Sequence, residues 1–294
     1  MSDVQFETEN ITSSDRILHT PSEFARKNLL YIQEVGSLKS LKPHESSRSG
    51  LDSFLFMIVT HGSGKVTLQG KEYHIQEGDA VLLNCNDEYS HISDKKNPWE
   101  LSWVHFNGQS APAYYETFVE RNKAADGAPV FTPKNLKEYG KILDAIRSEQ
   151  DDVKTMSEFH TSLHLTKLLT QIISDVTKNP TRSESMKLSK IRTAVNERFQ
   201  ESELLEKLCA EYDVDEVTLN EEYKKKFGID LYDYILNRRF TYAKELLRFT
   251  VKPVKEIVVE SGIANADLFR HLFVDKEGMT AEEYRKRWSQ WNRG

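Results

Sequence analysis

The sequence predicts an α+β multidomain chain, with a β-barrel or β-sandwich first and an all-helical domain last. Three observations support this. Short apolar or alternating runs separated by turn residues fill residues 16 to about 130. Beyond residue 186 the apolar residues recur at helical spacing instead. The segments on the two sides of one long helical stretch, 231–247, also repeat each other. A chain of 294 residues is long enough for two hydrophobic cores.

The β-rich half contains the runs LLYIQEV, SFLFMIVT, KVTLQG, KEYHI, AVLLN and WELSWVHF, with glycine turns among them. Many short strands at this spacing are typical of a sandwich or a barrel. Two helical patterns follow, at 135–149 and at about 155–178. The second has a broader apolar face than one side of a sheet needs. It therefore packs either on the barrel or on the same helix of a second subunit.

A polar stretch at 179–185, NPTRSES, contains turn-forming residues and predicts a linker. We expect a β domain at 1–132, a helical segment at 133–179, the linker at 180–186 and a helical domain at 187–294. The helical domain holds 20 Lys+Arg and 20 Asp+Glu, so the net charge of -6 lies in the remainder. Neither part is the basic domain expected of a strong DNA binder.

Helices are predicted in the last domain at 188–199, 202–212, 215–227, 231–247, 253–261, 265–277 and 280–288. Pro253 suits a first helical position, and Thr280 with Glu283 forms a capping box. Gly228 and Gly278 each follow a helix end, as C-cap glycines do. These signals fix where several of the helices begin and end.

The helix at 231–247 is the centre of this domain. Asp230 takes its N-cap position, and its apolar residues form one stripe. Arg239 lies on that stripe. Because a buried guanidinium must be paired, we expect Arg239 to form a structural ion pair.

The two flanks of the central helix are copies of each other. Apolar and glycine positions of the first flank recur in the second at an offset of 49, then 50. Each copy is a helix, a short turn and a helix, which predicts two helix-turn-helix units. The alternative is a pair of purely structural helical hairpins. A central helix of about 25 Å would hold two recognition helices, 217–226 and 266–276, on the scale of one turn of DNA, about 34 Å.

The segment from about 188 to 288 resembles the DNA-binding domain of AraC/XylS-family transcriptional regulators. The likeness rests on LxxLC, YKKKFG, LYDYILNRRFTYAKELL, VKEIVVESGI and LFxxxF followed by GMTAEEYR. The runs GSGKVTLQGKEYHIQEGDAVLL and WELSWVHFNG resemble the cupin-type sensor domain often joined to it. The resemblance implies a cupin-like β-barrel for ligand sensing, a helical dimerisation segment and a double helix-turn-helix domain.

The resemblance also implies a set of DNA contacts, which we carry over to Thr218, Asn220, Glu221, Lys224, Lys225, Lys226, Arg238, Asp267, Arg270 and His271. Family members usually have arginine where this chain has Glu221 and His271, and a basic pair where it has Val274 and Asp275. A glutamate is repelled by phosphates, although it can accept a hydrogen bond from cytosine. We therefore expect an intact fold with reduced DNA affinity.

The sensor half offers polar and aromatic candidates for an effector pocket: His44, Arg48, Tyr89, His91, Trp99, Trp103 and His105. Trp and Tyr faces stack on sugars, while Arg and His bind hydroxyls or carboxylates. The alternative is that Trp103 and His105 face a filled core. The histidines lack the HxH-like pair of a metal-binding cupin, so we expect no metal, no cofactor and no catalytic residues.

These observations predict a ligand-responsive transcriptional regulator rather than an enzyme. Its expected partners are promoter DNA, a small effector such as a sugar or related metabolite, a second copy of the chain and RNA polymerase. Two alternatives stay open: a regulator that acts through protein partners, and a cupin-type sugar-modifying enzyme. No signal peptide or membrane-spanning run is present, and two cysteines without zinc or redox spacing suit reduced thiols in the cytoplasm.

Overall fold

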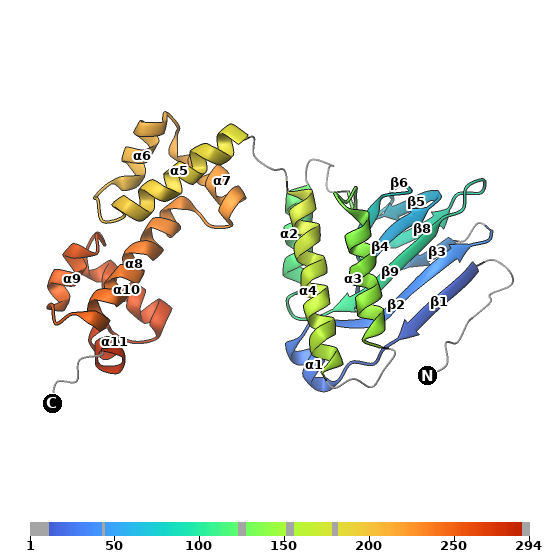
Figure 1. Cartoon of the computed structure of the whole chain (residues 1–294), viewed down its shortest axis with the longest axis horizontal. Helices are drawn as coiled ribbons and strands as arrows, with labels where there is room; N and C mark the ends of the chain where they lie inside the picture. Colours follow the sequence, from blue (N-terminus) through green and yellow to red (C-terminus); the bar gives the residue numbers. More distant parts are fainter. Residues whose placement is uncertain (1–11, 43–44, 123–127, 151–155, 178–181, 290–294) are drawn as a thin grey trace. The chain divides into compact units, whose positions relative to one another are not determined.

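A computed structural model of the chain describes residues 12–42, 45–122, 128–150, 156–177 and 182–289. The chain forms two compact units, Met1–Lys178 and Asn179–Gly294 (Figure 1). None of the helices in these ranges is long and apolar enough to cross a membrane.

The first unit is built on two antiparallel sheets. One has six strands in the order β1-β2-β9-β4-β7-β10, and the other has four in the order β3-β8-β5-β6. Together they confirm the predicted β domain. The strands are β1 (Thr12–Leu18), β2 (Tyr31–Ser40), β3 (Glu45–Arg48), β4 (Phe54–His61), β5 (Ser63–Leu68), β6 (Lys71–Gln76), β7 (Ala80–Asn84), β8 (Tyr89–Ser93), β9 (Glu100–Asn107) and β10 (Val130–Phe131).

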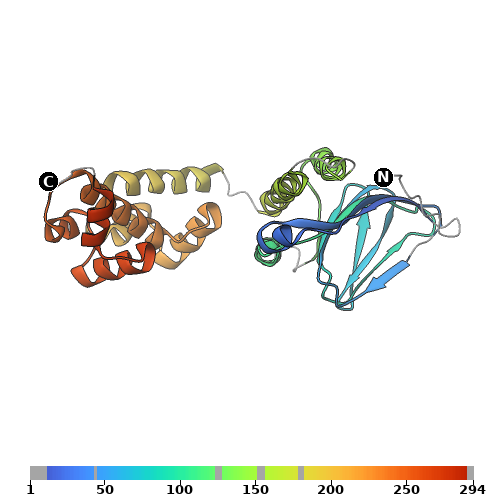
Figure 2. The same ribbon diagram turned by 90° about the horizontal axis from the view of Figure 1, so that it is seen from below.

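The six-stranded sheet is buried on both faces, which explains the unbroken apolar run of β4. Phe56 and Ile58 belong to a core shared with helices, whereas Met57 and Val59 belong to a core between the two sheets. Alternate residues of a strand point to opposite faces, so both sets must be apolar. The helices lie on one side only, as Figure 2 shows: α2 (Ala111–Arg121), α3 (Leu136–Ser148) and α4 (Ser157–Val176).

Two helices interrupt the region for which the sequence predicted β structure alone. α1 (Glu23–Asn28) begins at Ser22, whose hydroxyl accepts a hydrogen bond from the Ala25 amide. α2 has a proline in its first turn. Both are short and lie between strands, so strand spacing masked them. In addition, β1 starts at Thr12, before the predicted start at residue 16.

The broad apolar face of α4 divides into two parts. Leu165, Leu168 and Ile172 are buried in the core shared with the six-stranded sheet. Phe159 and Leu163 are exposed, and the Phe159 ring lies 5.5 Å from that of Phe24 on α1. One part of the face therefore packs on the β domain, and the other part stays uncovered in this single chain.

The second unit is helical throughout the residues described. Its helices are α5 (Arg182–Arg198), α6 (Leu204–Tyr212), α7 (Glu216–Phe227), α8 (Leu231–Phe249), α9 (Val254–Glu260), α10 (Ala266–Glu277) and α11 (Ala281–Trp288). α5 begins inside the predicted linker, so residues 182–186 are helical and that part of the prediction was wrong. Residues 180–181 lie outside the described ranges.

The predicted helix ends are largely confirmed. Thr280 and Glu283 form the capping box, and Gly228 and Gly278 end α7 and α10 with φ angles of 77° and 67°. Such left-handed angles cost a glycine little. Pro253 is the N-cap residue of α9 rather than its first helical residue.

α8 divides the second unit into two cores, one for each helix-turn-helix. Its N-terminal half contributes Leu231 and Ile235 to a core with α5, α6 and α7. Its C-terminal half contributes Ala243 and Leu247 to a core with α9, α10 and α11. Each repeat therefore packs around its own end of one shared helix, as the duplicated pattern predicts.

Candidate functional site

A cavity of about 100 Å³ lies between the two sheets of the first unit. Five of the seven predicted ligand residues line it: Arg48, Tyr89, His91, Trp103 and His105. The remaining lining residues are Arg16, Glu34, Leu38, Ser46, Leu55, Met57 and Leu101. The cavity is smaller than the usual range of ligand pockets, about 300–1,000 Å³.

Strand register explains why these side chains meet. In the β3·β8 pair, Arg48 lies opposite Tyr89 and Ser46 lies opposite His91. Directly paired residues point to the same face. Tyr89 belongs to the core between the sheets. Both residues of β3 therefore face the interior.

A glycine makes room on the opposite wall. Gly36 of β2 is paired with Arg16 on one side and with Trp103 on the other. A Cβ atom at Gly36 would lie 2.8 Å from the Trp103 ring. Without that atom, the Arg16 guanidinium lies over the Trp103 ring, 5.5 Å from its centroid.

Glu34 holds both members of this stack. Its Oε1 accepts a hydrogen bond from Trp103 Nε1 at 3.1 Å and forms an ion pair with Arg16 at 3.7 Å. Neither Arg16 nor Glu34 was among the residues predicted from the sequence. Arg16 stands at the edge of the predicted β region, and a register shift between Ile32 and Glu34 hides the alternation that would have indicated an inward glutamate.

His105 is held as a neutral ring. Burial, followed by the charges of Arg48 and Arg16, lowers the pKa of His105 to about 4. Its Nδ1 lies 3.0 Å from Ser53 Oγ. Burial also raises the pKa of the Tyr89 phenol, which is therefore protonated and able to donate.

Two predicted ligand residues are not in the cavity lining. Trp99 is fully buried behind it, 6.0 Å from the His91 ring and tight against Gly64. Its position is that of a core residue, so the structure does not place it with the other five. His44 lies outside the described residues.

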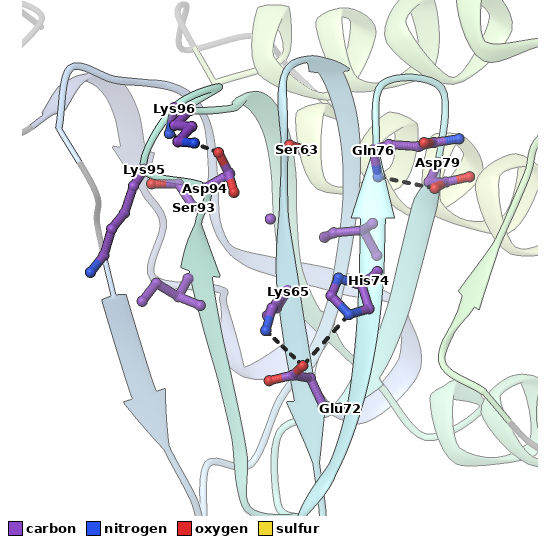
Figure 3. Close-up of a pocket in the computed structure, with 13 residues that line it drawn as sticks. Ser63, Lys65, Glu72, His74, Gln76, Asp79, Ser93, Asp94, Lys95 and Lys96 are labelled. Carbon is purple, nitrogen blue, oxygen red and sulfur yellow. Dashed lines mark hydrogen bonds and ion pairs between the residues drawn. The ribbon is translucent and has the colours of Figure 1, made fainter.

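A second, open depression of about 1040 Å³ lies on the outer face of the four-stranded sheet (Figure 3). Lys65 and His74 converge there on the Glu72 carboxylate, at 2.8 Å and 3.7 Å. None of the predicted ligand residues lines it. Its central charges are already paired, which makes it a less suitable effector site than the interior.

The described part of the chain contains no group of three or more His, Cys, Asp or Glu side chains that could hold a metal ion. Both cysteines are free, and Cys85 is buried, which raises the pKa of its thiol to about 11. A thiol with a raised pKa is a weak nucleophile.

The predicted DNA contacts of the first repeat are divided between surface and interior roles. Thr218, Glu221, Lys224 and Lys225 are exposed on α7. Lys226 is half-buried and donates to Ser189 of α5 at 3.0 Å. Lys224 pairs with Asp230 at 3.4 Å, which reduces its net attraction for phosphate.

Asn220 has a structural bond that the sequence did not reveal. Its Oδ1 accepts from the Leu231 amide at 3.1 Å and so caps α8. Asp230, the predicted cap, takes the N-cap position but makes no capping bond with its side chain. One lone pair of the Asn220 amide oxygen is therefore engaged within the fold, which limits how this side chain can turn toward a base.

The second repeat exposes Asp267, Arg270 and His271 on α10. Arg270 pairs with Asp267 at 3.1 Å. Arg238 is not on a recognition helix: it lies on α8 with its guanidinium 5.4 Å from the centroid of the Phe199 ring. Fewer of the predicted DNA-contacting residues are therefore available as free cations than the sequence indicates.

Arg239 is paired, but not with a carboxylate as predicted. Its Nε and Nη2 donate to the backbone carbonyls of Phe199 and Glu201 at the end of α5. The predicted ion pair was therefore wrong in its partner. The charged side chain instead satisfies carbonyls that a helix end leaves without intrahelical donors.

Comparison with known proteins agrees with both units. The family of AraC-like ligand binding domains matches residues 33–173, and a helix-turn-helix domain family matches residues 208–287. The MmsAB operon regulatory protein of Pseudomonas aeruginosa is 22% identical over 266 residues, which cover 88% of this chain and 83% of that protein. The lactose operon transcription activator of Staphylococcus xylosus is 22% identical, with coverage of 79% and 83%.

A third relative is the HTH-type transcriptional activator RhaR of Enterobacter sp. (strain 638). It is 24% identical over 241 residues, which cover 79% of this chain and 84% of that protein. All three relatives align across the sensor and the helical unit together. The chain belongs to the AraC family of transcriptional regulators, with an N-terminal cupin-like ligand-binding domain and a C-terminal helix-turn-helix DNA-binding domain.

Proposed function

We propose that the effector of this transcriptional regulator is a sugar or related small metabolite that binds between the two sheets. The observation that carries the proposal is the convergence of five predicted ligand residues on one cavity. The Trp103 ring offers a face for CH groups, and Tyr89 and Arg48 offer donors for hydroxyls or carboxylates. One relative is named for the lactose operon, which supports this class of effector.

We further propose that the chain acts in the cytoplasm as a homodimer on promoter DNA, where RNA polymerase is a further partner. Exposed Phe24, Phe159 and Leu163 form an apolar surface on α1 and α4 that a second copy would cover. The predicted domain limits, 1–132 for sensing, 133–179 for dimerisation and 187–294 for DNA, remain part of this proposal.

The effector would act by favouring one arrangement of the chain over another, since a ligand shifts an equilibrium only by its differential affinity. We place this coupling in the helical segment that packs on the six-stranded sheet. The barrel would bind its ligand without converting it. Its relatives are regulators, and this supports a sensor over the alternative of a sugar-modifying enzyme.

The test is a footprint of the full-length chain on the DNA upstream of its own gene, repeated across salt concentrations with and without a panel of sugars. We expect a protected region whose extent or affinity changes with one effector. Because Glu221 and the pairing of Arg270 reduce the positive charge available, we expect micromolar rather than nanomolar affinity at physiological salt.

Two results would redirect the proposal. Nanomolar binding at physiological salt would show that Glu221 and His271 do not weaken the interface. No protection at any salt concentration would favour the alternative of a regulator that acts through protein partners. Recovery of a chemically altered sugar after incubation would favour the enzyme.

A further inference from the structure

We propose that the effector is an acid: a small molecule with one carboxylate, bound between Arg48 and Arg16 inside the barrel. This inference rests on the proposed function, because it assumes that the cavity between the sheets is the effector site. It goes further by fixing the charge and the size of the molecule that binds there.

The residues that line the cavity carry an unequal number of positive and negative charges. Two guanidinium groups, Arg16 and Arg48, face one carboxylate, Glu34. His105 adds no charge near neutral pH, because burial and the two arginines lower its pKa to about 4. The lining therefore carries one positive charge in excess. One carboxylate neutralises it, whereas a phosphate monoester, with a charge of about −1.5 to −2, would overcompensate it.

The Arg48 guanidinium is the group in the lining best placed to bind a carboxylate. Arg48 forms no hydrogen bond or ion pair with any residue in the ranges that the structure describes, whereas Arg16 has Glu34. Its place opposite Tyr89 directs it to the interior face of β3. Its positive charge acts to lower the pKa values of His105, Tyr89 and Cys85. An arginine fork without a partner among the described residues matches a carboxylate, to which it can donate two parallel hydrogen bonds.

The cavity wall opposite Arg48 also offers a donor for a carboxylate. Arg16 lies against the Trp103 ring, and Glu34 fixes both groups in place. The Arg16 Nε is buried and has no hydrogen-bond partner among the described residues. A buried donor without a partner is costly, and an acceptor placed between the two arginines would reduce that cost.

The cavity also limits the size of the ligand and the chemistry of the part that is not a carboxylate. The cavity of about 100 Å³ lies below the usual range of ligand pockets, about 300–1,000 Å³. It suits an acid of a few carbon atoms better than a hexose. Leu55 and Met57 provide an apolar floor, and Ser46 and Tyr89 provide hydroxyls. A short hydroxy acid matches this combination.

The experiment measures binding to the full-length chain by calorimetry. The probes are lactate and 3-hydroxybutyrate as acids, lactamide as the neutral match of lactate, glycerol phosphate, and glucose. We expect an acid to bind and its neutral match to bind at least about tenfold more weakly. Arg48→Gln should weaken binding of the acid about tenfold or more, and Arg48→Lys should restore part of it.

The control variant is Lys65→Gln. It removes one positive charge from the same four-stranded sheet, but from the outer face, where Lys65 pairs with Glu72 (Figure 3). Binding of the acid should be unchanged in this variant. Although Arg48 lines the cavity, it stands on a short edge strand and is also exposed to solvent, so Arg48→Gln should unfold at the same temperature as the unsubstituted chain.

The outcomes separate this inference from the proposed function. If glucose binds equally well to the unsubstituted chain and to Arg48→Gln, the interior is an effector site but the acid inference is wrong. If glycerol phosphate binds more tightly than either carboxylate, the charge argument is wrong. If no probe binds, the acid inference is overturned, and the footprint with the wider sugar panel decides the proposed function.

Discussion

Arg239 and Phe199 lie 40 residues apart in the sequence, and Arg239 Nε donates to the Phe199 carbonyl oxygen at 2.5 Å. Nη2 of the same guanidinium donates to the Glu201 carbonyl at 2.6 Å. The next residue along, Gln200, donates from Nε2 to the Glu260 carbonyl at the end of α9. The end of α5 thus bonds to the shared helix and to the second repeat, and so it fixes one repeat against the other.

Replacing Arg239 by lysine should loosen this junction. Lysine keeps the charge but cannot donate to both carbonyls in the same planar geometry. We expect a loss of about 2–4 kcal/mol in the free energy of unfolding, measured by urea denaturation. The matched control is Arg287→Lys at an exposed position of α11, which should change stability by less than about 0.5 kcal/mol. Equal effects at the two positions would show that the junction contributes little.

Gly36→Ala should destabilise the sensor. The new Cβ would lie 2.6 Å from the Asp15 carbonyl oxygen and 2.8 Å from the Trp103 ring, so the wall of the cavity must move. Overpacking of this kind costs about 1–3 kcal/mol. Gly140→Ala on α3 is the control, because its Cβ meets nothing within 4 Å. That change should stabilise the helix by about 0.5–1 kcal/mol. The comparison requires only thermal unfolding curves of the two variants.

His105 makes stability depend on pH. Its folded pKa of about 4 lies below the ordinary value of 6.5, so the unfolded chain takes up the proton first as pH falls. The stabilisation is complete above pH 6.5 and is lost progressively towards pH 4. Between pH 7 and pH 5 this amounts to about 2 kcal/mol. Urea titrations of the unsubstituted chain and of His105→Gln should differ by this amount. Parallel pH profiles for the two proteins would contradict a neutral buried ring.

Glu221→Arg should strengthen DNA binding. Glu221 is exposed on α7, the predicted recognition helix of the first repeat, where its negative charge is repelled by phosphates. We expect about tenfold higher affinity at low salt and a salt dependence steeper by about one phosphate contact. Fluorescence anisotropy across a salt series measures both. Glu206→Arg adds the same charge on α6, outside the recognition helix, and should do less. Equal gains at both positions would indicate attraction by net charge alone.

Leu163→Glu should convert the proposed dimer into a monomer. Leu163 is 64% exposed on α4, beside the exposed rings of Phe24 and Phe159. A charge within an apolar interface pays desolvation without a partner. Sedimentation velocity would detect the change in mass. Asn86→Asp adds one negative charge in an exposed loop and should leave the assembly intact. If Leu163→Glu sediments like the unsubstituted chain, another surface forms the dimer.

The helical unit could be predicted closely because its signals are local. Gly228, Gly278 and the Thr280 capping box mark helix ends within a few residues. The duplicated spacing then indicates that the helices form two similar units. What the sequence could not supply was the partner of Arg239. Periodicity indicates that a side chain is buried, but the carbonyls it meets belong to the end of another helix.

The cavity, like the helical unit, could be predicted from the sequence only in part. Strand alternation placed Trp103 and His105 on one face, which the lining confirms. Arg16 and Glu34 were missed because their inward direction depends on pairing between strands and on a register shift in β2. Trp99 was included because of its residue type, although packing against Gly64 places it behind the wall.

Both arginines of the cavity stand on strands at the edge of their sheets, β1 and β3. An edge strand has one neighbour in its sheet, so each of these strands takes part in a single ladder, although the Arg16 side chain also contacts Trp103 of β9. If the cavity binds an acid as proposed, its preference for charge could therefore be changed at Arg48 with little effect on the fold.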